Sequence, residues 1–190
     1  MIQLRPFFIS LRTQNHAGGF TLIELLLVLA VMGILSSMAV PNYQRVMAQR
    51  EVDRVTLQLR DHFELARTYA QTHQTQVSVC PVSSAELNNT SLQCTNTPRN
   101  WQAWMVQTED GTVLARSYPL AEGLNIDSKS REDFVFNKRG GVKGDNGSVA
   151  LENTQTGIAK SVVISSDGRI QLYNCNRVKD SECTGGVKNN

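Results

Sequence analysis

The sequence is poor in the residues on which most enzyme and metal chemistry depends. Only three histidines occur among 190 residues, and only His62 and His73 lie beyond residue 20. The four cysteines are too widely spaced for paired zinc knuckles, and no histidine lies near them. No nucleophile elbow and no pair of carboxylates at catalytic spacing is present. The sequence therefore predicts no enzyme, no catalytic residue, no metal site and no cofactor.

An excess of charge of one sign is also missing from most of the chain. The formal net charge is +2, and residues 1–76 carry it, with seven Lys/Arg against five Asp/Glu. Residues 77–190 hold twelve of each. Bulk charge thus gives this larger part no general attraction for nucleic acid, and such a role would need a local basic patch. Internal repeats are absent as well.

What the chain does have is one long apolar run, from Phe20 to Val40. As a helix, this run would be about 30 Å long at a rise of about 1.5 Å per residue, enough to cross the hydrocarbon core of a bilayer. One carboxylate, Glu24, lies near its start. An isolated carboxylate in hydrocarbon costs a few kcal/mol or more, so Glu24 is expected to have a partner and a function.

Two simpler interpretations of this run compete. An ordinary secretory signal could be cut after Ala39, because Ser37-Met38-Ala39 has small residues at suitable places. Against it, the run is too long for a typical signal core and contains Glu24. A plain membrane anchor would explain the length but not the order glycine, phenylalanine and then glutamate.

The stretch Gly18-Gly19-Phe20-Thr21-Leu22-Ile23-Glu24 resembles the prepilin signal of type IV pilins and type II secretion pseudopilins. The resemblance implies that a dedicated peptidase cuts between Gly19 and Phe20 and methylates the new N-terminus. It also implies that Glu24 meets the N-terminal amine of a neighbouring subunit, and that residues 1–19 are a leader. Pro41 has the same offset from the cut as the helix proline of pilins, and a kink is expected there.

Beyond Pro41 the pattern becomes that of an amphipathic helix, continuing to residue 74. Apolar residues recur at spacings of three and four, which places them on one helical face. This stripe is expected to pack on the chain's own β-domain rather than in a coiled coil, because the run is short and lacks a pairing code of charges. The stripe consists of Val52, Val55, Leu59, Phe63, Ala66 and Ala70.

The composition favours β-strands from Val77 onward, within the expected β-rich domain of residues 75–190. Strand-like segments alternate with turn signals, among them Asp167-Gly168 and the glycine-rich stretch 138–147. The first strand is expected to stop at Pro81. Trp101 and Trp104, three apart in one expected strand, should face opposite sides, so that at least one is in the core. The expected strands are 77–80, 101–106, 113–115, 134–136, 149–151, 160–164 and 169–172.

Four cysteines allow three disulfide pairings. The sequence-local one joins Cys80 to Cys94 and Cys175 to Cys183, closes two short loops and is the favoured pairing. Disulfides imply an oxidising compartment, so the C-terminal domain should lie outside the cytoplasm. The distribution of arginines on either side of the apolar run does not settle the orientation by itself.

The remainder of the chain resembles the GspH/FimT branch of minor pilins and pseudopilins. The resemblance implies an α+β, type IV pilin-like fold, in which a long N-terminal helix, first transmembrane and then amphipathic, packs on an antiparallel β-sheet domain. The expected divisions of the chain are a leader (1–19), a transmembrane and assembly helix (20–41), its amphipathic continuation (42–74) and a periplasmic β-rich domain (75–190). The matching segments are Leu65-Ala66-Arg67, Val77 to Cys80, Trp101 to Trp104, Phe134 to Asn137 with Gly140, and Val162 to Ile170.

This resemblance implies a minor subunit that helps to initiate or tip a type IV pilus or a type II secretion pseudopilus. The expected location is the bacterial inner membrane, crossed once, with the C-terminal domain in the periplasm, and afterwards the filament. The expected partners are other pilins or pseudopilins, the prepilin peptidase and the inner-membrane assembly platform. The residues leave open whether the chain serves a pilus or a secretion system.

An alternative function is DNA binding during natural transformation, because one FimT-like subgroup binds DNA through basic residues near a Gly-Arg-x-Arg ending. Here that ending is Gly168-Arg169-Ile170-Gln171, so the second arginine is replaced. If the remaining basic residues converge, they form a patch that could contact several phosphates. The simpler explanation of these residues is that they are surface charges that keep the protein soluble. The candidates are Lys138, Arg139, Lys143, Arg169, Arg177 and Lys179.

Overall fold

The computed structural model describes residues 20–83, 94–95, 101–128 and 131–175, without the side chains of residues 38–42. In this part of the chain, one helix precedes eight strands. The chain divides into two compact units, residues 1–42 and 43–190. Helix α1 (Leu22–His73) supplies residues to both units.

Helix α1 begins and ends with recognisable caps. The backbone N–H of Glu24 donates to the side-chain oxygen of Thr21 at 3.3 Å, so Thr21 satisfies one of the free donors of the first turn. At the other end, Gln74 follows the helix with a φ of 52°, the left-handed conformation that terminates many helices.

Pro41 lies inside the bounds of α1. No helix in the described ranges is both long and apolar enough for a membrane span.

The first sheet of the second unit has the strand order β3-β2-β1-β5 and is antiparallel. Its strands are β1 (Val77–Val82), β2 (Ala103–Thr108), β3 (Val113–Arg116) and β5 (Phe134–Phe136). Strand β1 is central: Val77 pairs with Thr108 of β2 on one side and with Phe136 of β5 on the other. Two predictions were wrong here, because β1 continues through Pro81 and β2 starts two residues after Trp101.

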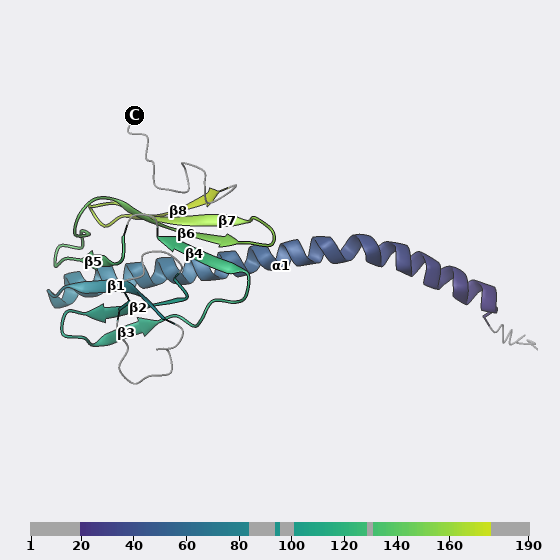
Figure 1. Cartoon of the computed structure of the whole chain (residues 1–190), viewed down its shortest axis with the longest axis horizontal. Helices are drawn as coiled ribbons and strands as arrows, with labels where there is room; N and C mark the ends of the chain where they lie inside the picture. Colours follow the sequence, from purple (N-terminus) through teal and green to yellow (C-terminus); the bar gives the residue numbers. More distant parts are fainter. Residues whose placement is uncertain (1–19, 84–93, 96–100, 129–130, 176–190) are drawn as a thin grey trace, which may run out of the picture. The chain divides into compact units, whose positions relative to one another are not determined.

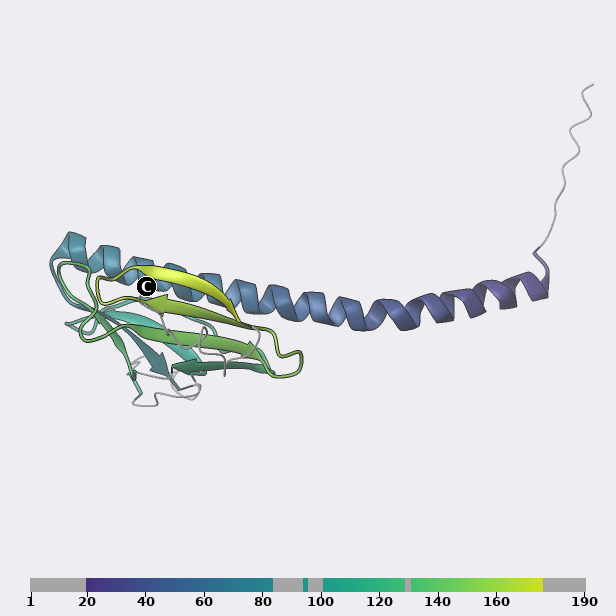
Figure 2. The ribbon, with the colours of Figure 1, turned by 90° about the horizontal axis from the view of Figure 1, so that it is seen from above.

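The second sheet has the order β4-β6-β7-β8, also antiparallel. Its strands are β4 (Leu124–Ser128), β6 (Gly147–Asn153), β7 (Ala159–Ile164) and β8 (Ile170–Cys175). Strand β4 is missing from the sequence prediction. Figures 1 and 2 show both sheets beside the part of α1 that belongs to this unit.

One hydrophobic core joins this part of α1 to both sheets. All six residues of the predicted amphipathic stripe are buried, with at most 2% of each residue exposed. Phe63 makes an edge-to-face contact with Phe134 of β5, with ring centroids 5.1 Å apart, and Trp101 contacts the same ring at 6.4 Å. Trp101 and Trp104 are both buried in this core. The prediction that the stripe packs on the chain's own β-domain is confirmed.

Candidate assembly and binding surfaces

The start of α1 combines a cap with a carboxylate. Thr21, Leu22, Ile23 and Glu24 form the Thr-x-x-Glu signature of a capping box, although the structure gives only the bond from the Glu24 N–H to Thr21 Oγ1. The negative charge of Glu24 lies in the first turn, where the helix dipole favours it. Among the described residues, the Glu24 carboxylate makes no hydrogen bond or ion pair.

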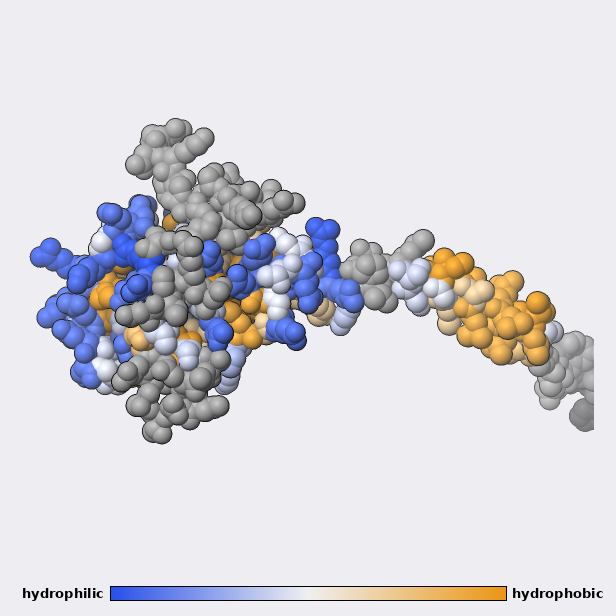
Figure 3. Space-filling model, viewed as in Figure 1, coloured by the Kyte–Doolittle hydropathy of each residue, from blue (hydrophilic) through white to orange (hydrophobic). Residues whose placement is uncertain are grey.

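Most of the exposed side chains that follow are apolar, and Figure 3 shows those on the face in view in orange. A helix that is apolar on every side is normally buried in a protein or a membrane. The exposed apolar residues of this unit are Phe20, Leu22, Ile23, Leu25, Leu26, Leu27, Val28, Leu29, Val31, Met32, Ile34 and Leu35. We call these residues the apolar segment.

Among the predicted processing and assembly positions, the structure describes Phe20 and Glu24 fully, Pro41 in part and Gly19 not at all. Gly19 lies outside the described residues, and Phe20 is the first residue described, with 86% of its surface exposed. The backbone of Pro41 is helical, and its side chain is not described. The Thr21 cap was not predicted, although the Thr-x-x-Glu spacing carries a readable signal for it.

The local disulfide pairing is confirmed for its first member. Cys80 and Cys94 form a disulfide, with Cα atoms 5.5 Å apart. Cys80 lies in a small buried cluster with Val82 and Met105, against which Cys94 packs. Cys175 is also disulfide-bonded, and Cys183, its expected partner, lies outside the described residues.

The structure brings two of the predicted basic segments together. Lys138, Arg139 and Lys143 lie in the β5–β6 connection and Arg169 in the β7–β8 turn, all exposed. The two connections touch: a Cβ on Gly168 would come within 1.8 Å of the Gly140 carbonyl oxygen. The backbone N–H of Val142 also donates to the Ser166 carbonyl at 3.0 Å.

The end of α1 fixes the same β5–β6 connection. Gln71 Nε2 donates to the Arg139 carbonyl at 3.0 Å, and Gln74 Nε2 lies 3.5 Å from the Lys138 carbonyl. These amides hold the backbone of the two basic residues and leave their side-chain charges free. The sequence prediction missed this role of the glutamines, because long-range bonds from an amide to a backbone carbonyl have no local pattern.

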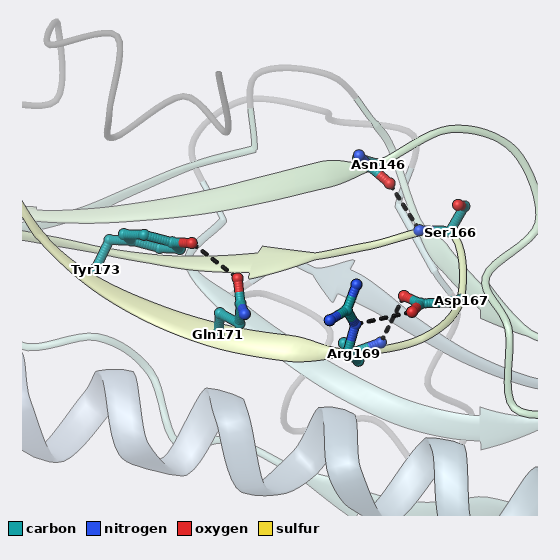
Figure 4. A network of polar contacts seen from close by, with 6 residues as sticks. All are labelled: Asn146, Ser166, Asp167, Arg169, Gln171 and Tyr173. Atoms are coloured by element: carbon teal, nitrogen blue, oxygen red, sulfur yellow. Dashed lines mark hydrogen bonds and ion pairs between the residues drawn. The ribbon is translucent and has the colours of Figure 1, made fainter. Parts of the chain in front are cut away.

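Arg169 is not a free cation (Figure 4). Its Nε lies 2.8 Å from Asp167 Oδ2, and its backbone N–H also donates to that carboxylate. This N–H, followed by the guanidinium of the same residue, lowers the pKa of Asp167. Gln171 Oε1 accepts a hydrogen bond from the Tyr173 hydroxyl at 2.8 Å. Arg177 and Lys179 lie outside the described residues.

The family described as Type II transport protein GspH matches residues 56–168, more than half of the chain. The chain belongs to the GspH family. The prokaryotic N-terminal methylation motif matches residues 14–40, ahead of the GspH region and over the apolar segment. Together they make the GspH-family chain a member of the type IV pilin superfamily. The family is structural rather than enzymatic in general.

Relatives of the GspH-family chain include pilins. The chain is 54% identical over 37 residues to the type IV major fimbrial protein FimA of Dichelobacter nodosus, 20% of this chain and 24% of FimA. It thus spans about a quarter of the length of that relative. It is 29% identical over 134 residues to the type IV major pilin protein PilE1 of Neisseria gonorrhoeae, 69% of this chain and 72% of PilE1.

The fold is also found in a solved structure. The type IV minor pilin FimU of Pseudomonas aeruginosa superposes with a TM-score of 0.51 at 19% identity, covering 65% of this chain and 89% of FimU. At this identity the similarity shows the fold alone. A helix packed on antiparallel sheets is therefore a type IV pilin-like fold, as the sequence predicted.

Proposed function

We propose that a prepilin peptidase cuts the chain between Gly19 and Phe20, and that the product is a subunit of a type IV pilus or a type II secretion pseudopilus. The observation that carries this proposal is the start of α1. The helix is capped by Thr21, one residue after the proposed new N-terminus, and continues into the exposed apolar segment. Residues 1–19 would then be a leader, 20–41 an assembly helix, 42–74 its amphipathic continuation and 75–190 the β-rich domain.

The apolar segment would reside in the inner membrane before assembly, with residues 75–190 in the periplasm. The Cys80–Cys94 disulfide supports this orientation, because such bonds persist in oxidising compartments. On assembly the segment would leave lipid for a bundle of similar helices. There the unpaired carboxylate of Glu24 would meet the N-terminal amine of a neighbour, which removes the cost of an isolated charge.

The filament would be hetero-oligomeric, and this subunit would act early, priming the filament or occupying its tip. Its partners would be other pilins or pseudopilins, the peptidase and the inner-membrane assembly platform. Mass spectrometry of the native polypeptide tests the processing: we expect a methylated N-terminal Phe20. An N-terminus at Met1 or after Ala39 would contradict the proposal.

Assembly is tested separately with Glu24→Gln, which keeps the size of the side chain and removes its charge. We expect processed Glu24→Gln protein to stay in the membrane fraction and to be lost from filaments sheared off the cell. The matched control is Glu64→Gln, a partly buried glutamate on the same helix in the other unit. Scoring a deletion strain for twitching, secretion and DNA uptake separates a pilus role from a secretion role.

A second candidate function is DNA binding for uptake, favoured by the contact between the β5–β6 connection and the β7–β8 turn. That contact gathers Lys138, Arg139, Lys143 and Arg169. The pairing of Arg169 with Asp167 and the glutamine at position 171 oppose it.

A mobility-shift assay of the full chain in detergent, at low and high salt, tests this candidate. If the patch binds DNA, Arg169→Ala with Arg177→Ala should weaken the shift, and Asp167→Asn should strengthen it by releasing Arg169. Arg116→Ala, an exposed arginine on β3, is the matched control. No shift at low salt, or a shift that the double variant leaves unchanged, would reject DNA binding.

A further inference from the structure

A hollow of about 460 Å³ lies within the second unit, away from the basic connections described above. Three elements line it: α1, the β6–β7 turn with the start of β7, and the end of β8. Its charged and amide side chains come from α1 and from the paired strands β7 and β8, in which Lys160 is opposite Asn174. The lining consists of Arg45, Gln49, Thr156, Gly157, Ile158, Ala159, Lys160, Asn174 and Cys175.

The charged groups around this hollow leave it positive. Lys160 Nζ forms an ion pair with Asp53 Oδ1 at 2.6 Å, and both side chains are partly buried. An ammonium group has three N–H donors, so this contact leaves two unused. Arg45 is exposed, and among the described residues it forms no ion pair. Arg45, Lys160 and Asp53 together carry one net positive charge.

The available donors suit an anion with several oxygens. The guanidinium of Arg45 offers five N–H groups and the amides of Gln49 and Asn174 two each, next to the ammonium of Lys160. Small residues, Gly157 and Ala159, form part of the wall, and a Cβ on Gly157 would meet nothing within 4 Å. A tetrahedral phosphate group can accept hydrogen bonds from several of these donors at once.

The position of Arg45 in the chain indicates where such a phosphate would come from. Arg45 follows the last residue of the apolar run, Val40, by five positions. Even fully extended, five residues span at most about 18 Å, so Arg45 cannot be far from the membrane surface if the apolar run is in the bilayer. At that surface, lipid headgroups are the most concentrated phosphates.

We propose that this hollow binds the phosphate group of an anionic phospholipid through Arg45 and Lys160. The inference rests on the proposed membrane residence of the chain. The lipid would hold the β-domain at the membrane surface until the helix leaves the bilayer for the filament. Assembly would then have to break this contact. A higher content of anionic lipid in the membrane would therefore slow the release of the subunit into the filament.

The test is a lipid titration of the full chain in detergent, followed by native mass spectrometry. The probes are phosphatidylglycerol, phosphatidylcholine and inorganic phosphate. We expect phosphatidylglycerol to bind more tightly than phosphatidylcholine. Arg45→Gln and Lys160→Gln should each weaken phosphatidylglycerol binding about fivefold, the factor expected for one basic group near an anionic membrane surface.

Arg54→Gln is the matched control, because Arg54 lies on the same helix but pairs with Glu51 and does not line the hollow. It should leave binding unchanged. Since Lys160→Gln also breaks the pair with Asp53 and could disturb folding, Arg45→Gln decides the outcome. Equal binding of the two lipids, binding insensitive to Arg45→Gln, or binding of inorganic phosphate without any preference for phosphatidylglycerol would overturn the proposal.

Flotation with phosphatidylcholine vesicles distinguishes a failure of this proposal from a failure of the membrane anchor. An anchored chain floats with neutral vesicles whether or not the hollow binds anionic lipid. A chain that does not float would contradict the proposed function itself.

Discussion

His62 of α1 accepts a hydrogen bond at Nδ1 from Trp104 Nε1 of β2, at 2.9 Å. The bond joins the helix to the first sheet next to the core, and it requires an unprotonated Nδ1. Burial lowers the pKa of His62 below its ordinary value of 6.5, while the nearby carboxylate of Asp61 acts in the opposite direction. The folded domain therefore favours the neutral imidazole.

This bond makes stability depend on pH in a definite direction. The pKa of His62 is lower in the folded chain than in the unfolded chain. Below about pH 6.5 the unfolded chain therefore binds more protons at His62 than the folded chain does, and acid favours unfolding. The free energy of unfolding should be constant above that pH as far as His62 is concerned. Below it, the free energy should fall by at most about 1.4 kcal/mol per pH unit until the folded-state pKa is reached.

Urea unfolding of the full chain in detergent, at several pH values, measures this dependence. His62→Gln supplies an acceptor that does not titrate, so its unfolding should lose this component of the pH dependence. An identical pH profile in the wild-type chain and in His62→Gln would show that the His62–Trp104 bond is not responsible.

The Cys80–Cys94 disulfide should contribute strongly to stability. It closes a loop of 14 residues in sequence separation, for which chain entropy gives about 3 kcal/mol. Replacing both cysteines by serine should lower the free energy of unfolding by about 2–4 kcal/mol, measured in urea. Reductant should destabilise the wild-type chain by more than it destabilises this double variant, because the variant has already lost this bond.

Phe63 should be the most costly residue of the amphipathic stripe to truncate. It is fully buried and contacts the rings of Phe134 and Phe136. Phe63→Ala should therefore cost about 3–5 kcal/mol of unfolding free energy. Leu65→Ala on the same helix should cost well under 1 kcal/mol, because Leu65 is 39% exposed. Similar losses in the two variants would contradict the packing of this stripe.

Gly168 should tolerate no side chain. Its φ is +82°, and an added Cβ would overlap the Gly140 carbonyl oxygen. Gly157 has a φ of +69° but open space around it, so Gly157→Ala isolates the conformational cost of about 1–2 kcal/mol. Gly168→Ala should lower the melting temperature clearly more than Gly157→Ala does. The added Cβ at position 168 also forces the β7–β8 turn away from the β5–β6 connection. Equal losses of stability in the two variants would mean that the backbone at Gly140 can move away from position 168 at no cost in stability.

Local patterns were enough to predict much of the fold. The stripe from Val52 to Ala70 and the strand Phe134–Phe136 follow directly from helical and strand periodicity. The pilin-like fold and the first disulfide were also predicted. These features depend on residues close together in the sequence, or on a motif that marks the whole family.

The errors arose where distant segments decide the local structure. Strand β1 tolerates Pro81 because β5 pairs with β1 only as far as Val79, so nothing on that side needs the missing N–H. Trp101 is buried without belonging to β2, because its backbone N–H donates to the Ile126 carbonyl of β4. Neither fact is visible in a window of neighbouring residues. The meeting of the Gly140 and Gly168 connections likewise depends on tertiary packing.

The cap at the start of α1 has a consequence for the order of events in maturation. Since Thr21 supplies both the side-chain and the backbone acceptor of the first turn, the hydrogen bonds of the helix from Glu24 onward need no residue before Thr21. A protease that cuts before Phe20 would remove a segment that takes part in none of these hydrogen bonds. Cleavage would therefore expose a new amine without unwinding anything, and the shortened chain could enter a filament with its helix already complete.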